Sequence, residues 1–316
     1  MIVNKQNTTP SQRYDPTLTT GLRNAFSRDM KHRFNELMQM IVVAIVKQDC
    51  FALGTPKINT FQMVPPGFKA FDFLTDPAKV EEFMRWLQTQ VDKGLLTIGE
   101  GSQIGQAIQE AWTNRYILDS YKRGIIRARY ELQKAGYPSL ESSGGIDVSM
   151  NIPIHLDRVG LLYIRAFNEL KGVTDAMSQA ISRVLTQGMI DGDGMRLIAR
   201  KLVATINGQG IGDLGLTDIL GRYISPMQRA LTIARTEIVR AHHLATIQEY
   251  RNWGVLGIKV MGEWSTTNDD RVCNECASLD GKIFTLDEIE PMIPRHPNCR
   301  CVALPYIAEL EPYYSN

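Results

Sequence analysis

Apolar residues recur every three to four positions along most of the chain up to residue 253, and this spacing predicts amphipathic helices. One helix start is clearly marked, because Asp76 can cap the first turn and Pro77 suits it. Gly172 is expected to end another helix, since glycine readily closes a helix. The predicted helices run from about Thr17, from Asp76, over 102–135, up to 170, and over 174–186, 193–206 and 226–253.

The period changes after Gly254, where short runs at 258–266, 282–284 and 302–304 predict strands. The expected fold class is mainly α, with helical N-terminal and central regions and a small C-terminal α+β unit. The predicted parts are a flexible arm (1–16), an N-terminal helical domain (17–138), a linker (139–153), a central helical region (154–253), the α+β unit (254–305) and a tail (306–316).

The composition is that of an ordinary soluble protein, with 44% hydrophobic and 22% charged residues. A formal net charge of +1 gives no general reason to bind nucleic acid, so any basic surface has to be local. The polar stretch 1–15 lacks the apolar core of an export signal, and the apolar run 40–46 is too short to span a bilayer. We therefore expect a protein made in the cytoplasm, with no membrane partner.

A local basic surface is predicted on the helix that ends near Ala135. It is either a solvated helix face or a contact with DNA or with an acidic protein surface, which salt would weaken. The basic residues are Lys122, Arg123, Arg127, Arg129 and Lys134.

Four of the five cysteines lie close together in the sequence. Cys50 stands apart in an apolar helical pattern and is expected to be a buried small hydrophobe. In a chain without an export signal, the cluster indicates a metal before disulfides, because the cytoplasm keeps thiols reduced. The clustered cysteines are Cys273, Cys276, Cys299 and Cys301.

The spacing of this cluster is typical of a structural zinc site. Cys273-x-x-Cys276 can place two thiolates on one ion, and His296-Pro-Asn-Cys299-Arg-Cys301 offers a second turn. Five donors then compete for four places, and we favour the four cysteines, with His296 as an alternate ligand or a partner of the ligands. Reduced core thiols and a disulfide pair are the alternatives. A zinc staple suits the α+β unit, since so small a unit lacks a robust core of its own.

Four short motifs stand out in the last third of the chain. They are Ile233-Ala-Arg235-Thr-Glu237, Trp264-Ser-Thr-Thr-Asn-Asp-Asp270-Arg-Val-Cys273-Asn-Glu-Cys276, Leu279-Asp-Gly281 and His296-Pro-Asn-Cys-Arg-Cys301. Together they resemble the signature of the phage head-morphogenesis family, which includes the minor head proteins of Mu-like phages. The resemblance covers about 229–305. It implies a structural protein of the virion, present in few copies, that binds the portal protein or the major capsid protein during head assembly.

Structural roles are expected for the other residues of these motifs. We expect Arg235 and Glu237 to tie their helix to the α+β unit through charged hydrogen bonds. Asp269 and Asp270 are expected to form a turn before the first clustered cysteine, by accepting backbone N–H bonds. Trp264 is expected to pack in the core.

The alternative function is an enzyme carried in the head and ejected with the DNA. Glu288-x-Glu290, with Arg235 upstream, is faintly similar to elements of ADP-ribosyltransferases, and His296 with Asn298 could serve a nuclease. The Ser-Thr-Ser element of those transferases is missing, and the sequence has no phosphate-binding glycine loop. We therefore predict a structural protein and no enzyme.

Overall fold

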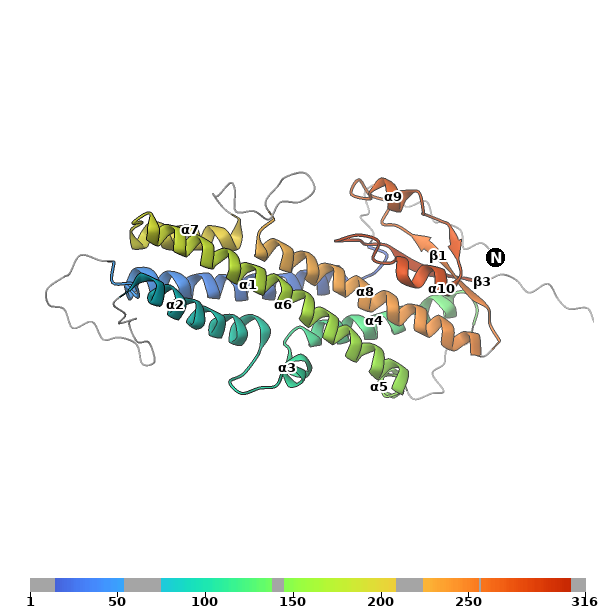
Figure 1. Ribbon diagram of the computed structural model, residues 1–316. Coiled ribbons are helices and arrows are strands. Elements are labelled where there is room, and N and C mark those ends of the chain that lie inside the picture. The colour runs from blue at the N-terminus through green and yellow to red at the C-terminus, as the bar shows by residue number, and fades with distance from the viewer. Residues whose placement is uncertain (1–14, 54–74, 138–144, 209–223, 256, 308–316) are drawn as a thin grey trace, which may run out of the picture. The chain divides into compact units, whose positions relative to one another are not determined.

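The protein is mainly helical, with a three-stranded sheet near its C-terminus beside the Cys/His cluster, which confirms the predicted fold class (Figure 1). Among the described helices, none is both long and apolar enough to cross a membrane. The described residues of this computed structural model are 15–53, 75–137, 145–208, 224–255 and 257–307. The longer helices are α1 (Thr20–Val42), α2 (Asp76–Val91), α4 (Asn114–Lys134), α6 (Pro153–Ile190), α7 (Met195–Asn207) and α8 (Pro226–Val255).

The shorter described elements lie between these helices or follow α8. The π-helical turns η1 (Val43–Lys47) and η2 (Asp92–Leu96) extend α1 and α2. The remaining helices are α3 (Ile104–Glu110), α5 (Gly145–Met150), α9 (Asn274–Ala277), α10 (Leu286–Ile289) and the 3-10 turn η4 (Glu290–Met292).

The start of α2 and the end of α7 agree with the sequence. α2 begins at Asp76 with Pro77 in its first turn, but its N-cap residue is Thr75 and no side chain caps the helix, so the predicted capping by Asp76 was wrong. α7 ends before Gly208, whose φ of +78° is the left-handed conformation that closes a helix. Two boundaries that no strong cap marks were predicted wrongly.

The predicted helix over 102–135 is two helices, α3 and α4, because the backbone leaves the helical conformation at Ala111. The predicted stop at Gly172 does not occur, and α6 continues through it. One glycine costs a helix only about 1 kcal/mol. Leu170 and Val173 are both buried, so the apolar face of α6 is continuous across the glycine.

The chain forms two compact units, each assembled from segments that are far apart in the sequence. Unit 1 contains the described parts of 1–26, 113–166 and 233–316. Unit 2 contains those of 27–112 and 167–232. The consecutive domain boundaries that the sequence suggests stay a prediction.

Trp112 joins separate segments of unit 2 through a hydrogen bond and a ring contact. Its indole N–H donates to the carbonyl of Leu95 at 2.9 Å, in the π-helical turn after α2. The Arg33 guanidinium lies 4.3 Å from the centre of the Trp112 ring and donates to the carbonyl of Gly94 at 2.6 Å. One arginine of α1 thus fixes both this turn and the ring beside it.

In unit 1, α4 and α8 cross at very short range. A Cβ added at Gly124 would lie 2.2 Å from the carbonyl oxygen of His242, so only glycine fits. The Ser120 hydroxyl donates to the carbonyl of Ile238 at 2.6 Å, and the Thr246 hydroxyl donates to the carbonyl of Gly124 at 3.2 Å. Small side chains and buried hydroxyls therefore set the distance between the two helices.

The sheet of unit 1 has the strand order β2-β1-β3 and is antiparallel. Its strands are β1 (Val260–Ser265), β2 (Ile283–Phe284) and β3 (Val302–Ile307), close to the runs that predicted strands. Trp264 of β1 is fully buried, as expected of a core residue. It shares a core with Tyr250 and Trp253 of α8. We call residues 257–307, which form this sheet and its loops, the Cys/His lobe.

Candidate metal centre

The first pair of candidate ligands lies at the start of α9. Cys273 is the N-cap of this helix, and its Sγ accepts the backbone N–H of Cys276 at 3.4 Å. Cys276 is one turn further on and is buried, whereas Cys273 is exposed. The turn therefore presents both sulphurs, one at the surface and one in the core.

The other candidate ligands, His296, Cys299 and Cys301, lie in and next to the turn before β3. The backbone N–H of Cys299 donates to the carbonyl of His296 at 3.1 Å, which closes the turn. Asn298 has a φ of +59°, a left-handed conformation that asparagine tolerates better than most residues. The backbone N–H of Asn298 donates to the Thr236 hydroxyl of α8 at 3.0 Å. The turn is thus fixed against α8 as well as within itself.

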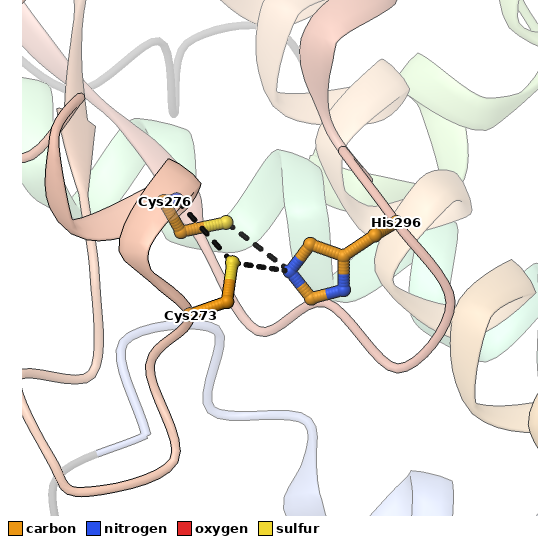
Figure 2. A group of neighbouring side chains, drawn as sticks. All are labelled: Cys273, Cys276 and His296. Carbon is orange, nitrogen blue, oxygen red and sulfur yellow. Dashed lines mark hydrogen bonds between the residues drawn. The ribbon is translucent and has the colours of Figure 1, made fainter. Parts of the chain in front are cut away.

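His296 points its ring towards the first pair of cysteines (Figure 2). Its Nε2 lies 3.4 Å from Cys273 Sγ and 3.2 Å from Cys276 Sγ. Its Nδ1 lies 2.9 Å from the carbonyl oxygen of Pro297. Because a carbonyl only accepts, Nδ1 carries the proton in the neutral ring, and Nε2 directs a lone pair at the two sulphurs.

All five predicted donors come together in two overlapping groups. One group is Cys273, Cys276 and His296, and the other is Cys276, Cys299 and Cys301. Within each group, the ligand atoms lie within 4.8 Å of one another. Thiolates with an imidazole are a ligand set that suits zinc, so these residues can hold a metal ion.

Cys50 lies outside both groups. It is buried, and burial raises the pKa of its thiol to about 12. A protonated, buried thiol behaves as a small hydrophobe, which agrees with the interpretation from the sequence.

A bidentate ion pair that the sequence did not reveal holds together the two turns that carry the candidate ligands. Arg300 donates to both carboxylate oxygens of Asp269, at 2.7 Å each. Asp269 also accepts the backbone N–H of Arg271 at 3.1 Å, as its predicted turn role requires. Hydrogen bonds from Arg300 hold the pKa of the Asp269 carboxyl well below its usual range. Asp270 is exposed, so Asp269 is the aspartate that organises this turn.

The predicted role of Glu237 was wrong, and that of Arg235 stays a prediction. Glu237 is buried but accepts from Arg165 of α6 and Arg240 of α8, each at 3.2 Å, and not from the Cys/His lobe. Thr236, between the two predicted residues, makes the contact with the lobe. The backbone of the turn comes close enough to α8 for the short side chain of Thr236 to reach it.

The glutamates of the faint transferase motif have structural partners. Glu288 forms a capping box with Thr285 at the start of α10. Glu290 accepts from Arg158 of α6 and Arg251 of α8, at 2.7 Å each. Burial alone would raise the pKa of Glu290, but hydrogen bonds from these two arginines lower it to about 2.

The basic residues of α4 are largely neutralised by carboxylates. Arg127 is buried and pairs with Glu131, and Arg129 pairs with Glu249. The other pairs are Lys122 with Asp147 and Arg123 with Asp119. Arg127 and Arg129 thus serve the packing of unit 1, whereas Lys122 and Arg123 form ion pairs at its surface. A contact of this helix with DNA stays a prediction.

The motifs that predicted a phage head-morphogenesis protein form a single arrangement in unit 1, in which α8 meets the Cys/His lobe. Residues 179–304 match the model of the family described as Phage Mu protein F like protein. This match confirms the predicted family resemblance and includes all five candidate metal donors. No curated protein and no solved structure matches the chain.

Proposed function

We propose that this chain is a structural component of the phage head that binds the portal protein or the major capsid protein during assembly. The family match over 179–304 carries the proposal, because the family is one of head morphogenesis. The protein is then made in the cytoplasm of the bacterial host and ends in the virion.

The contacts of the charged residues support a structural role. Glu288 and Glu290, which a transferase would need free, hold a helix cap and a pair of arginines. His296, which a nuclease would need as a base, turns its lone pair to two thiols. A catalytic group has to reach a substrate, and these groups are already engaged.

A phage that carries a stop codon early in this gene tests the head role. We expect defective or poorly infectious heads, and we expect wild-type heads to contain the chain. Co-purification of the tagged chain with separately produced portal protein or major capsid protein identifies the partner. Normal heads without the chain, or wild-type heads that never contain it, would overturn the proposal.

Assays of the purified protein test the absence of catalysis. We expect neither DNA cleavage nor transfer of label from NAD. Activity that is lost in His296→Ala would establish a nuclease, and activity lost in Glu290→Ala a transferase. Either result would replace the structural role with an enzymatic one.

We propose further that the Cys/His cluster holds one structural Zn²⁺. Bound zinc would join two turns of a lobe whose helices and strands are short, and such sites contribute folding energy directly. Elemental analysis of gently purified protein is expected to give about one equivalent of zinc. Cys276→Ser is expected to abolish binding, because Cys276 belongs to both donor groups, whereas Cys50→Ser is the matched control that keeps it. Less than about half an equivalent in the wild type would contradict the proposal.

A further inference from the structure

We propose that the zinc ligands are Cys273, Cys276, His296 and Cys299, and that Cys301 lies outside the coordination shell as a buried thiol. This assignment rests on the metal binding proposed above and sharpens it. It replaces the four-cysteine set that the spacing of the sequence favours.

The two turns of the cluster are closed differently, but each presents two donors three positions apart. In the first turn, the backbone N–H of Cys276 reaches back to Cys273 Sγ at 3.4 Å. In the second, the backbone N–H of Cys299 reaches back to the carbonyl of His296 at 3.1 Å. Two such turns facing each other provide the four ligands of a tetrahedral zinc ion.

The hydrogen bond at Nδ1 makes His296 a ligand and not a bystander. Metal-binding histidines commonly donate their other ring N–H to a carbonyl or carboxylate, which fixes the tautomer and the ring orientation. His296 has this arrangement, with Nδ1 held by Pro297 and Nε2 directed at Cys273 and Cys276 (Figure 2). The His296 ring can therefore bind an ion held by Cys273 and Cys276 without displacing either thiol.

With three ligands assigned, one place remains for Cys299 or Cys301. Cys299 closes the His296 turn, because its backbone N–H donates to the carbonyl of His296 at 3.1 Å. Cys301 shares a donor group with Cys276 and Cys299, and all three are buried. It directly precedes β3, so the pairing of Val302 with Ser265 limits its movement towards the exposed Cys273. Cys299 is therefore the fourth ligand.

Cobalt(II) substitution in the full-length protein tests the assignment, because the intensity of the thiolate-to-cobalt charge-transfer band counts thiolate ligands. Cys301→Ser is expected to keep the wild-type spectrum and one bound ion. Its matched variant Cys299→Ser is expected to lose roughly one third of the band, or the ion altogether. His296→Cys is expected to keep the ion and to raise the band by about one third.

X-ray absorption of the zinc-loaded wild type gives an answer that does not depend on whether a variant folds. We expect three sulphurs at about 2.3 Å and one nitrogen at about 2.0 Å from zinc. A shell of four sulphurs would overturn the assignment and leave metal binding intact, as would a band lost in Cys301→Ser but kept in Cys299→Ser. A wild type that binds neither zinc nor cobalt would overturn metal binding itself, and this assignment with it.

Discussion

The crossing of α4 with α8 and the Cys/His lobe belong to the same unit, but different forces hold them. At the crossing, Gly124 lets two long helices approach closely, and buried hydroxyls bond to backbone carbonyls. In the lobe, α9 and α10 have four residues each and β2 has two, so regular hydrogen bonding is sparse apart from the pairing of β1 with β3. Specific side-chain contacts replace it.

This difference predicts where each region is sensitive. Close packing fails when volume is added, because a packed interior has no room to yield. A lobe held by a few polar contacts and by the proposed metal fails when one contact is removed, because so small a unit has little core of its own. Added side-chain volume should therefore destabilise the crossing of α4 with α8 more than the lobe. Loss of a ligand should destabilise the lobe more than the crossing.

Removal of the metal is expected to have the largest effect, and only on the lobe. With a chelator, amide hydrogens of β1 and β3 should exchange roughly 1,000-fold faster, which corresponds to about 4 kcal/mol. Amides at the centre of α4 should keep their protection, because the crossing uses no metal. Hydrogen exchange with mass spectrometry measures both regions in one sample. Equal acceleration in α4 and in β1 would mean that the two regions are not stabilised separately.

Gly124→Ala is expected to have the next largest effect, and to act on the crossing. The new Cβ would meet the carbonyl of His242 at 2.2 Å, so the helices must move apart. We expect a loss of about 3 kcal/mol in the free energy of unfolding, measured in urea. Gly160→Ala in α6 is the matched control, because a Cβ there meets nothing within 4 Å. The control should gain about 0.5–1 kcal/mol, and a similar gain for Gly124→Ala would refute the close approach.

The sequence predicted the fold best where a proline, a glycine or a change in the spacing of apolar residues marks a boundary. The Pro77 start of α2, the Gly208 end of α7 and the change of period at the lobe were all visible. The continuity of α6 through Gly172 was not, because the buried residues on either side decide it. Neither was the assembly of each compact unit from separated segments, since a helix pattern does not identify its partners.

The candidate site was predicted in its residues but not in its arrangement. All five donors were found from spacing, because zinc turns have typical intervals. The orientation of His296 was out of reach, since it depends on the carbonyl of Pro297. The Asp269–Arg300 pair was also missed, although an arginine between two cysteines and an aspartate shortly before Cys273 were signals that could have suggested it.

Arg300→Lys is expected to loosen the lobe by a smaller amount. Lysine cannot make the two parallel bonds to Asp269, and both side chains are largely buried. We expect a loss of about 1–2 kcal/mol, seen as faster exchange in the Cys/His lobe without a change in α4. Arg271→Lys is the control, because the Arg271 side chain is exposed and donates a single hydrogen bond to the same aspartate. Equal losses in both variants would show that bidentate geometry is not what matters.

The smallest effect is expected at Glu290, the ionic link between the lobe and the two helices α6 and α8. Its pKa of about 2 lies below the ordinary value of 4.5, because bonds from Arg158 and Arg251 outweigh its burial. A lowered pKa adds stability above pH 4.5, and this stability is lost as the pH falls through about 2. We expect Glu290→Gln to cost about 1 kcal/mol near neutral pH, and this difference from the wild type to shrink on acidification. Urea unfolding of both proteins across this range measures it. A difference that stays constant down to a pH of about 2 would show that the carboxylate charge of Glu290 does not stabilise the link.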